Sequence, residues 1–242
     1  AKNDDKVRNR VEESCKKILR HKYQLALNNY KAKSSDRLNN DLHQNKYYVL
    51  KQRLYNEAVT MLMNKKEILP LNKDDNKKIA VVTFGKDNSI AKSLTGHGFK
   101  NTSFLFDKNT SEEEMKRCVK QLKSYDYVIV NIRNTSNSPS KDYGITPNML
   151  TFLKSLPKGN DVIVNIFGSP YAVDKFSFKK NVQALLVGYE DNEMVANAII
   201  DIIVGKSSPK GKLPVSLKAY KCGYGMSYKN HLSPETLSMA LI

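Results

Sequence analysis

Three acidic side chains, Glu190, Asp191 and Glu193, lie close together after a short apolar segment. Paired carboxylates suit acid–base and nucleophilic chemistry, and enzymes that hydrolyse glycosidic bonds place two of them roughly 5–9 Å apart across the bond. Acids this close in sequence are crowded for that two-sided task. They also suit the first turn of a helix, where negative charge complements the helix dipole. We interpret the cluster as a helix start, and we leave open that Glu190 faces a shared cleft.

Phosphate-binding and nucleotide-binding patterns are incomplete in this sequence. The segment Gly205-Lys206-Ser207-Ser208 ends like a phosphate-binding loop, but Ile200 stands where the earlier glycine belongs, and the segment closes a predicted helix instead of opening one. The apolar run that ends at Thr83-Phe84-Gly85 offers a single glycine, whereas a dinucleotide site needs several for its tight turn and close backbone approach. We therefore predict that the chain takes no cofactor.

The candidate nucleophiles lack their usual partners. Gly168-Ser169-Pro170 is not the Gly-x-Ser-x-Gly turn of a serine hydrolase, because Tyr171 and Ala172 occupy the next two places. Of the four histidines, only His97 comes near a predicted strand-end loop, and its two flanking glycines favour a turn residue over a base. The sequence therefore indicates no catalytic triad.

The three cysteines, Cys15, Cys118 and Cys222, are far apart and form no C-x-x-C pair. This spacing predicts neither a zinc site nor a redox motif. Cys15 and Cys118 fall on the apolar faces of predicted helices, where we expect them to act as small buried hydrophobes.

Two patterns of apolar residues divide the chain. From Asp4 to about Met63 they recur at three- and four-residue spacing, as amphipathic helices require, with a polar interruption over residues 28–40. Helix pairs of this kind pack onto another body more often than they form a core of their own. Residues 68–78, which begin Ile68-Leu69-Pro70-Leu71 and then turn polar, mark a boundary.

Beyond Lys78, short apolar runs alternate with helical segments. Runs that are apolar on both faces indicate a parallel sheet covered on both sides. We predict an α/β fold: a doubly wound, mainly parallel sheet of five to six strands with helices on both faces, preceded by a helical linker. Strands are expected at residues 79–84, 103–106, 127–132, 162–167 and 184–187, helices at 111–123 and 193–204, and an edge strand at 212–216.

Ligand chemistry in such folds gathers in the loops that follow the carboxyl ends of the strands. In this chain those loops are residues 85–88, 133–143, 168–171 and 188–192. Any site that the chain contains is therefore expected in these loops.

The chain carries a formal net charge of +16, which invites the hypothesis that it binds nucleic acid. Residues 1–66 hold sixteen Lys or Arg against seven Asp or Glu, scattered through helices without a basic run or interleaved aromatic residues. We interpret them as solvated helix faces and predict no nucleic-acid partner. No run of about 18 apolar residues occurs and no signal peptide is visible at the charged start, so we predict no membrane partner.

Six segments, taken in order along nearly the whole chain, carry a family resemblance: residues 11–27, 54–71, 78–82, 166–171, 184–192 and 211–216. They resemble the C-terminal domain of family-3 glycoside hydrolases. The first two are similar to the helix that ends that family's catalytic barrel and to the link into its second domain. The other four are similar to strands and strand-end loops of that domain.

The resemblance implies a retaining hydrolase whose nucleophilic aspartate lies on an N-terminal (β/α) barrel, and we expect that barrel to be missing from these 242 residues. It implies an accessory domain without a catalytic residue of its own, with the barrel as its partner and the carbohydrate substrate at the domain boundary. Residues expected to border the cleft are Gly168, Ser169, Tyr171, Tyr189, Glu190 and Asp191.

The expected substrate follows from one departure from the family pattern. In β-glucosidase-like members the acid is a glutamate on the C-terminal domain, within a loop written E-G-x-D-R, but residues 134–144 contain no glutamate. The resemblance therefore favours members similar to β-N-acetylglucosaminidases, whose acid/base is a His–Asp pair on a barrel loop. Two alternatives stay open: a β-glucosidase-like parent with Glu190 or Asp142 near the acid position, and a free-standing flavodoxin-like binding module.

The tail adds a further expectation. Gly223–Ser227, followed by Leu232–Leu237, resembles the lead-in to a β-lactamase-like module that is fused to some bacterial family members. We therefore predict three parts: residues 1–70 as a helical linker from the missing catalytic barrel, 71–220 as the α/β C-terminal domain, and 221–242 as a tail leading to a further module. The resemblance also implies a periplasmic or extracytoplasmic location for the parent protein.

Overall fold

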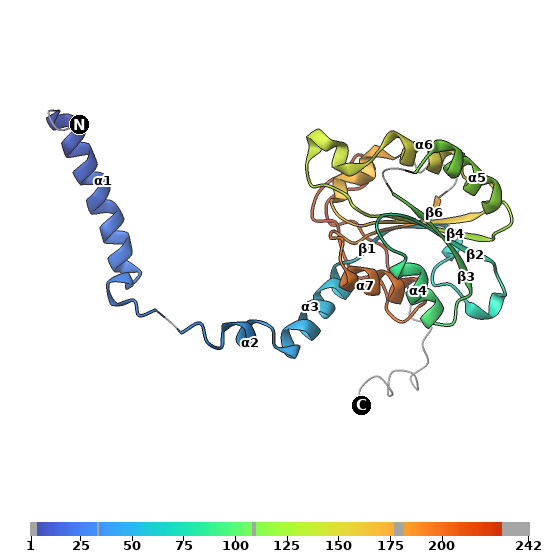
Figure 1. The fold of residues 1–242 in the computed structure, drawn as a ribbon, viewed down its shortest axis with the longest axis horizontal. Helices are drawn as coiled ribbons and strands as arrows, with labels where there is room; N and C mark the ends of the chain where they lie inside the picture. The colour runs from blue at the N-terminus through green and yellow to red at the C-terminus, as the bar shows by residue number, and fades with distance from the viewer. Residues whose placement is uncertain (1–3, 33, 108–109, 177–181, 229–242) are drawn as a thin grey trace. The chain divides into compact units, whose positions relative to one another are not determined.

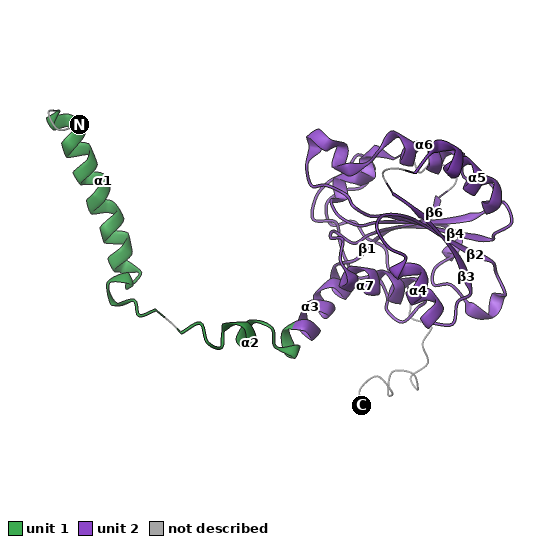
Figure 2. Ribbon diagram, viewed as in Figure 1, with its two compact units in different colours: residues 1–47 green, residues 48–242 purple. Residues whose placement is uncertain are grey.

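The computed structural model of the chain describes residues 4–32, 34–107, 110–176 and 182–228. The chain divides into two compact units, Ala1–Tyr47 and Tyr48–Ile242 (Figure 2). The first unit holds helix α1 (Asp5–Gln24), the short turn η1 (Leu27–Asn29) and helix α2 (Leu38–Leu42). The second holds the sheet and the helices that cover it.

Helix α1 has an apolar stripe that nothing in its own unit covers. Its side chains Val7, Val11, Ile18 and Leu19 are 42–61% exposed, and no described residue of the helix is buried. Cys15, which we predicted to be a buried hydrophobe, is exposed. The stripe satisfies the helical period, but a single helix cannot bury its own apolar face.

The second unit is a six-stranded sheet in the order β1-β6-β5-β4-β2-β3, in which only the edge strand β1 runs antiparallel, to β6. Its strands are β1 (Thr60–Asn64), β2 (Ile79–Phe84), β3 (Asn101–Phe106), β4 (Tyr127–Ile132), β5 (Asp161–Ile166) and β6 (Val182–Val187). The central strands are buried on both faces, as their largely apolar sequences require. The predicted fold class is confirmed.

Helices cover both faces of the sheet (Figure 1). Helices α4 (Ser89–Gly96) and α7 (Glu193–Ile203) lie together on one face, and α5 (Glu112–Leu122) and α6 (Pro147–Ser155) lie together on the other. Each face has its own buried apolar cluster, one centred on α7 and the other on the side chains beneath α5 and α6. Helix α3 (Asn45–Ala58) leads into β1, and the remaining short turns are η2 (Lys65–Glu67), η3 (Lys73–Asp75), η4 (Pro139–Gly144) and η5 (Pro170–Lys175).

The helix ends follow the local sequence signals. Ser111 and Glu114 form a capping box at the start of α5, in which each side chain accepts from the other residue's backbone N–H. Asn192 caps α7 by accepting from the Val195 N–H at 3.0 Å, and Gly205 follows the end of that helix with a φ of +79°. The helices predicted at 111–123 and 193–204 correspond to α5 and α7.

Two predictions of secondary structure are wrong. Residues up to Met63 were expected to continue a helix, but α3 ends at Ala58 and residues 60–64 form β1. The edge strand predicted at 212–216 does not form among the described residues. The Met226 N–H instead donates to the Met61 carbonyl and the Gly211 N–H to the Val59 carbonyl, so other segments occupy that edge of β1.

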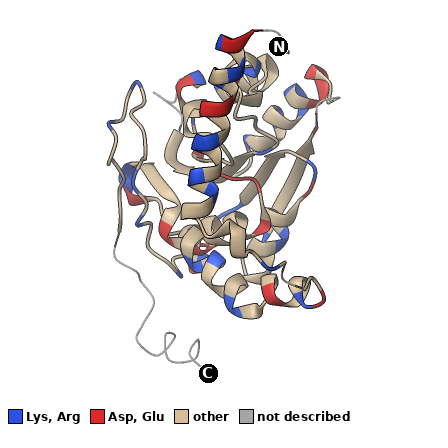
Figure 3. Ribbon diagram, turned by 90° about the vertical axis from the view of Figure 1, so that its left-hand side faces the viewer, with Lys and Arg blue, Asp and Glu red and all other residues tan. Residues whose placement is uncertain are grey.

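The boundaries of the three predicted parts stay predictions, although β1 joins the sheet ahead of residue 71. The tail segment Leu232–Leu237 lies outside the described residues. Basic residues are dispersed along the elements, with acidic residues between them (Figure 3). No helix within the described ranges is both long enough and apolar enough to span a membrane.

Candidate functional site

The carboxyl ends of the five parallel strands lie at one edge of the sheet, which we call the carboxyl edge. The strand order reverses direction beside β2: the chain goes from β2 to β3 on one side, and then to β4 on the other. In doubly wound folds the loops diverge at such a point and leave a crevice, where ligands bind. The candidate site therefore consists of the loops that follow β2, β4, β5 and β6.

Arg133 follows β4 directly and is the central charged group of this edge. Its side chain is only 9% exposed. Gly85, which follows the neighbouring strand β2, makes room for it, because a Cβ atom at Gly85 would lie 3.0 Å from the Arg133 Cβ. An arginine buried to this degree needs partners, since an uncompensated buried charge is strongly destabilising.

Partners for Arg133 come from two other loops. Its Nε donates to Asp191 Oδ1 at 2.6 Å, and its Nη1 donates to Asp87 Oδ1 at 2.9 Å and to Ser89 Oγ at 2.8 Å. The guanidinium also lies 5.2 Å from the centre of the Phe167 ring. One side chain after β4 thus ties together the loops after β2 and β6 and the end of β5.

The carboxylates around Arg133 are held in defined positions. Hydrogen bonds from Ser89, followed by the charge of Arg133, keep the pKa of the Asp87 carboxyl below its ordinary value. Asp191 uses its second oxygen to accept the Asn134 N–H at 2.8 Å. No described residue accepts a hydrogen bond from Arg133 Nη2, so this nitrogen keeps donor capacity for a ligand.

A buried polar row runs across the strands below Arg133. Asn165 Nδ2 donates to Asn131 Oδ1 at 2.8 Å, and Asn131 Nδ2 donates to Thr83 Oγ1 at 3.2 Å. The three residues are register partners on β5, β4 and β2 and are fully buried. The row fixes the relative register of the strands whose ends carry the site.

The loop after β5 carries three of the six predicted residues. Gly168 has a φ of +127°, and a Cβ atom there would lie 1.9 Å from Thr135 Oγ1, so only glycine fits. The Thr135 hydroxyl donates to the Phe167 carbonyl, which joins this loop to the one after β4. Ser169 is buried, whereas Tyr171 is exposed.

Tyr171 stacks on Tyr143, with ring centres 6.0 Å apart and an interplanar angle of 26°. Tyr143 belongs to η4, in which Asp142, Tyr143 and Gly144 have consecutive positive φ angles of 47°, 56° and 78°. Such strained backbone is costly and gathers at functional sites. Asp142 forms an ion pair with Lys175, which fastens η4 to η5.

The loop after β6 carries the other three predicted residues. Tyr189 has a φ of +67°, and its hydroxyl lies 2.6 Å from Thr60 Oγ1 on β1. Glu190 accepts hydrogen bonds from the Tyr55 hydroxyl on α3 and from Asn192 Nδ2. Burial, and then the bond to Glu190, raise the pKa of the Tyr55 phenol. Asp191 belongs to the Arg133 cluster described above.

A cavity of about 190 Å³ lies at the point where the strand order reverses. It is lined by Gly85 after β2, Arg133 and Asn134 after β4, Thr110 after β3, and Asn148 of α6. None of the six predicted residues lines this cavity. Whether those six border a cleft with another domain stays a prediction, although all six lie in loops of the carboxyl edge.

Catalytic groups of other kinds are not assembled in the described part of the chain. Among the described residues, His21 bonds to the Gln24 side chain, and His43 and His97 bond to the carbonyls of Asn39 and Ser93. None of these bonds joins a histidine to a nucleophile. No group of three His, Cys, Asp or Glu side chains there has a metal-binding arrangement. Burial raises the pKa of the Cys118 thiol to about 12, so it stays protonated and unreactive at neutral pH.

Sequence reasoning named the loops of this site but missed Arg133 as its centre. The available signal was a single arginine directly after the apolar run 127–132, with an aspartate in two other strand-end loops. Buried apolar strands rarely end in an unpaired charge, and that expectation points to Asp87 and Asp191 as partners.

The chain matches a known family model. The model of the glycosyl hydrolase family 3 C-terminal domain matches residues 59–237. No curated protein matches the chain at a significant level.

Solved structures share the fold. A β-glucoside phosphorylase, BglX, is 23% identical with a TM-score of 0.60, covering 86% of this chain and 38% of its own. A family 3 β-N-acetylglucosaminidase from Paenibacillus sp. str. FPU-7 is 17% identical with a TM-score of 0.61, covering 84% and 38%. A β-glucosidase from Listeria innocua, in complex with glucose, is 17% identical with a TM-score of 0.56, covering 78% and 34%. The chain thus spans little more than a third of the length of these proteins.

Proposed function

The chain belongs to the glycosyl hydrolase family 3 C-terminal domain family, and from this premise we propose that it is the accessory domain of a retaining glycoside hydrolase. The catalytic nucleophile lies on an N-terminal barrel that this chain does not contain. The substrate is a β-linked N-acetylhexosamine sugar, bound where barrel and accessory domain meet. The observation that carries the proposal is the family match over residues 59–237. It is joined to a carboxyl edge at which Asp87, Asp142, Glu190 and Asp191 all bond to other residues of the protein.

The engagement of the acids supports a positioning role. Asp191 and Asp87 hold Arg133, Asp142 holds Lys175, and Glu190 accepts from Tyr55 and Asn192. A general acid must reach the leaving oxygen of the substrate with its proton. Each of these carboxylates instead has at least one oxygen that holds a loop, and Asp191 uses both of its oxygens in this way. The edge is thereby suited to bracing a neighbouring active site without supplying its chemistry.

The sugar class is proposed from the loop after β4. Residues 134–144 contain no glutamate, and Asp142, the acid within them, is fastened to Lys175. A parent whose acid/base lies on its barrel does not need an acid in this loop, and that arrangement resembles β-N-acetylglucosaminidases. The six loop residues Gly168, Ser169, Tyr171, Tyr189, Glu190 and Asp191 then border the cleft as its wall.

Exposed apolar side chains support the barrel as partner. On α1 they are Val11 and Ile18, which are 61% and 56% exposed, and on α3 they are Leu50 and Leu54, which are 50% and 61% exposed. Amphipathic helices gain their stability chiefly by packing that face against another body. We propose that these faces contact the barrel, and that residues 221–242 lead to a β-lactamase-like module.

The proposal is tested by assaying the 242-residue chain beside the longer chain that includes the barrel. Both are given chromogenic β-N-acetylglucosaminide and β-glucoside. We expect no turnover by the shorter chain and turnover of the β-N-acetylglucosaminide by the longer one. Turnover by the shorter chain would place the nucleophile within these residues and refute the accessory role. A longer chain that cleaves only the β-glucoside would refute the sugar class alone.

The β-glucosidase-like alternative is tested in the longer chain with Glu190→Gln and Asp142→Asn. If either carboxylate is the general acid, its loss lowers kcat by about 10²–10⁴-fold while the chain stays folded. A substrate whose leaving group needs no proton would rescue that loss. We expect neither the loss nor the rescue, because both carboxylates serve their loops.

A further inference from the structure

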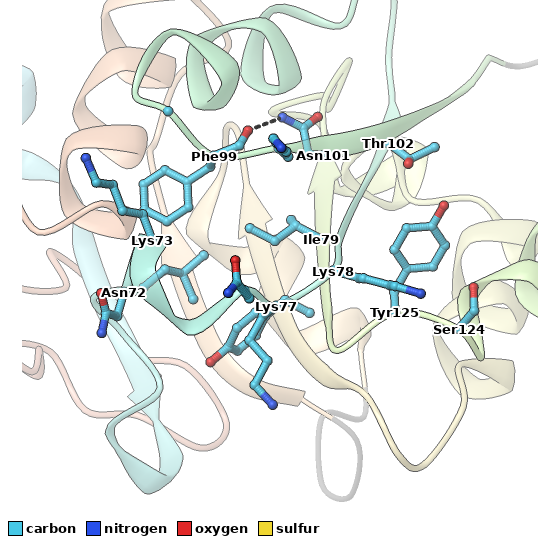
Figure 4. Close-up of a pocket in the computed structure, with 15 residues that line it drawn as sticks. Asn72, Lys73, Lys77, Lys78, Ile79, Phe99, Asn101, Thr102, Ser124 and Tyr125 are labelled. Carbon is cyan, nitrogen blue, oxygen red and sulfur yellow. Dashed lines mark hydrogen bonds between the residues drawn. The ribbon is translucent and has the colours of Figure 1, made fainter.

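A basic cavity lies at the opposite edge of the sheet. It has a volume of about 550 Å³ and is formed at the amino ends of β2, β3 and β4. Ile79, whose register partners are Asn101 and Tyr127, lies in its middle (Figure 4). We call it the amino-edge cavity. Its volume is within the range of about 300–1,000 Å³ that is typical of ligand sites.

Four lysines line the amino-edge cavity and no acidic residue does: Lys73, Lys77, Lys78 and Lys100. Among the described residues, only Lys77 of these four has a carboxylate partner, Asp126 at 3.5 Å, and both side chains of that pair are about half exposed. Unpaired ammonium groups around one concave surface create a positive potential there, which attracts an anion. The charged side chains of the lining itself are therefore all positive, although Asp75, Asp126 and Asp161 lie near enough to act on Tyr127.

Lysines from different segments surround the cavity. Lys73 lies in η3, and Lys77 and Lys78 precede β2, while Lys100 precedes the neighbouring strand β3. Figure 4 shows Lys73, Lys77 and Lys78 around Ile79, with Phe99 and Asn101 above it in this view. Charges placed around a hollow suit a ligand with several anionic groups better than a single small ion.

The remaining lining suits a sugar chain. Tyr125 and Tyr127 offer partly exposed rings and hydroxyls, and Thr102 and Ser124 add two more hydroxyls. Burial, together with the charges of Asp161, Asp75 and Asp126, raises the pKa of the Tyr127 phenol, so it stays a neutral donor. Aromatic rings with neighbouring hydroxyls can stack on and hydrogen-bond to pyranose rings.

We propose that the amino-edge cavity binds an acidic polysaccharide, one that carries carboxylate or sulfate groups on its sugar rings. The anionic preference follows from the lysines alone, whereas the choice of a carbohydrate rests on the proposed function. The six-residue strands β2 and β4 separate this cavity from the carboxyl edge by about 20 Å. The cavity therefore anchors the protein to a polymer at a place distinct from the cleft.

The test is calorimetric titration of the full chain at low salt with trigalacturonate and with a short heparin oligosaccharide, beside a neutral oligosaccharide. We expect both acidic probes to bind and the neutral one not to bind. The triple variant Lys73→Gln/Lys78→Gln/Lys100→Gln should weaken the affinity about tenfold or more, because each exposed ion pair contributes modestly and three are lost. All three side chains are exposed, and unfolding midpoints check that the variant folds.

The matched control is Lys86→Gln/Lys120→Gln/Lys154→Gln, which removes the same charge from exposed positions outside the cavity. It should keep the affinity of the unmodified chain. Equal weakening by both triple variants would mean diffuse attraction by the net charge and would overturn the proposal. So would the absence of binding at low salt, or binding of a DNA oligonucleotide through the same lysines without binding of either acidic sugar. None of these measurements depends on turnover, so failure here is distinguishable from failure of the proposed function.

Discussion

Replacing Arg133 by methionine tests whether one buried cation holds the carboxyl edge together. The guanidinium bonds to Asp191, Asp87 and Ser89 and lies over the Phe167 ring. Methionine keeps an unbranched, apolar stem of similar length, so the packing near the ring is largely preserved. What the variant removes is the charge and its hydrogen bonds.

The expected cost follows from how buried each partner is. Removing one member of a fully buried ion pair costs about 3–5 kcal/mol, because the other charge is left uncompensated. Here the Arg133 side chain is 9% exposed, but those of Asp191 and Asp87 are 24% and 54% exposed. Water can hydrate both carboxylates once the arginine is gone. We therefore expect a loss of about 2–3 kcal/mol in unfolding free energy, which lowers Tm by about 5–10 °C in a unit of this size.

The assay is urea unfolding of the full chain followed by circular dichroism. Arg117→Met is the matched control, because Arg117 lies exposed on α5 and forms no ion pair among the described residues; it should change stability by less than about 0.5 kcal/mol. In a double-mutant cycle, Arg133→Met and Asp191→Asn together should cost about 1 kcal/mol less than the sum of the single variants. An unchanged midpoint for Arg133→Met, or strict additivity in the cycle, would refute the reasoning.

Acid titration adds a check on the same cluster. The folded-state pKa of Asp87 is lowered, so its stabilising contribution is present above the ordinary carboxyl pKa and is lost as pH falls through the lower folded value. Asp87→Asn should therefore be less stable than the unmodified chain at neutral pH. The difference should vanish in acid, where the unmodified carboxyl is protonated as well. A difference that stays constant across this pH range would contradict the assignment.

Three further outcomes are expected. Gly168→Ala should lower the free energy of unfolding by about 1–3 kcal/mol, because its backbone would be strained and its Cβ would overlap Thr135. Gly96→Ala, in a helix with open space around it, should raise the free energy of unfolding by up to about 1 kcal/mol. The urea midpoints of the two variants compare these effects. Burial raises the pKa of the Asp201 carboxyl, so the native state loses stability as pH rises through that raised pKa. Asp201→Asn should therefore raise the urea midpoint at neutral pH but not in acid. Tyr55→Phe removes the donor to Glu190 and should cost about 0.5–1.5 kcal/mol in the same assay.

The central sheet could be predicted because its strands leave no ambiguity. Residues 79–84 and 127–132 form strands over the predicted spans, since each run is short, apolar on both faces and bounded by polar residues. The helix that begins after Asn192 was likewise indicated by Glu193 in its first turn and by the glycine after its end. Glu190 and Asp191, which we interpreted as part of the same helix start, precede the capping residue Asn192 and lie outside the helix. Local sequence decides these elements, and tertiary context does not override it.

Strand β1 could not be told from a helix by the same reasoning. Val59 to Leu62 are buried on every side, so their pattern shows neither the period of two nor the period of 3.6. Its strand pairing is with β6, more than a hundred residues away in sequence. The expected edge strand at 212–216 failed for a related reason, because the main-chain groups beside β1 are already paired with Gly211 and Met226.

The candidate site was predictable in place but not in its contacts. In parallel sheets ligands bind in the loops after the carboxyl ends of the strands, and this rule alone pointed to the loops after β2, β4, β5 and β6. The ion pairs of Arg133 join residues 46 and 58 positions apart, and no local pattern encodes such a distance. The bond between Tyr55 and Glu190 spans 135 positions. These pairings follow from strand order, which the sequence pattern alone does not specify.

The two edges of the sheet use positive charge in opposite ways, and salt should separate them. Arg133 is buried and satisfied by Asp87 and Asp191, whereas Lys78 and Lys100 at the other edge are exposed and have no carboxylate partner among the described residues. At 1 M salt the Debye length is about 3 Å, so exposed charges are screened while buried pairs are affected much less. Binding of trigalacturonate should then be lost, and the stability difference between the unmodified chain and Arg133→Met should persist. If that difference falls in parallel with binding, the Arg133 pairs behave as surface pairs and do not hold the carboxyl edge.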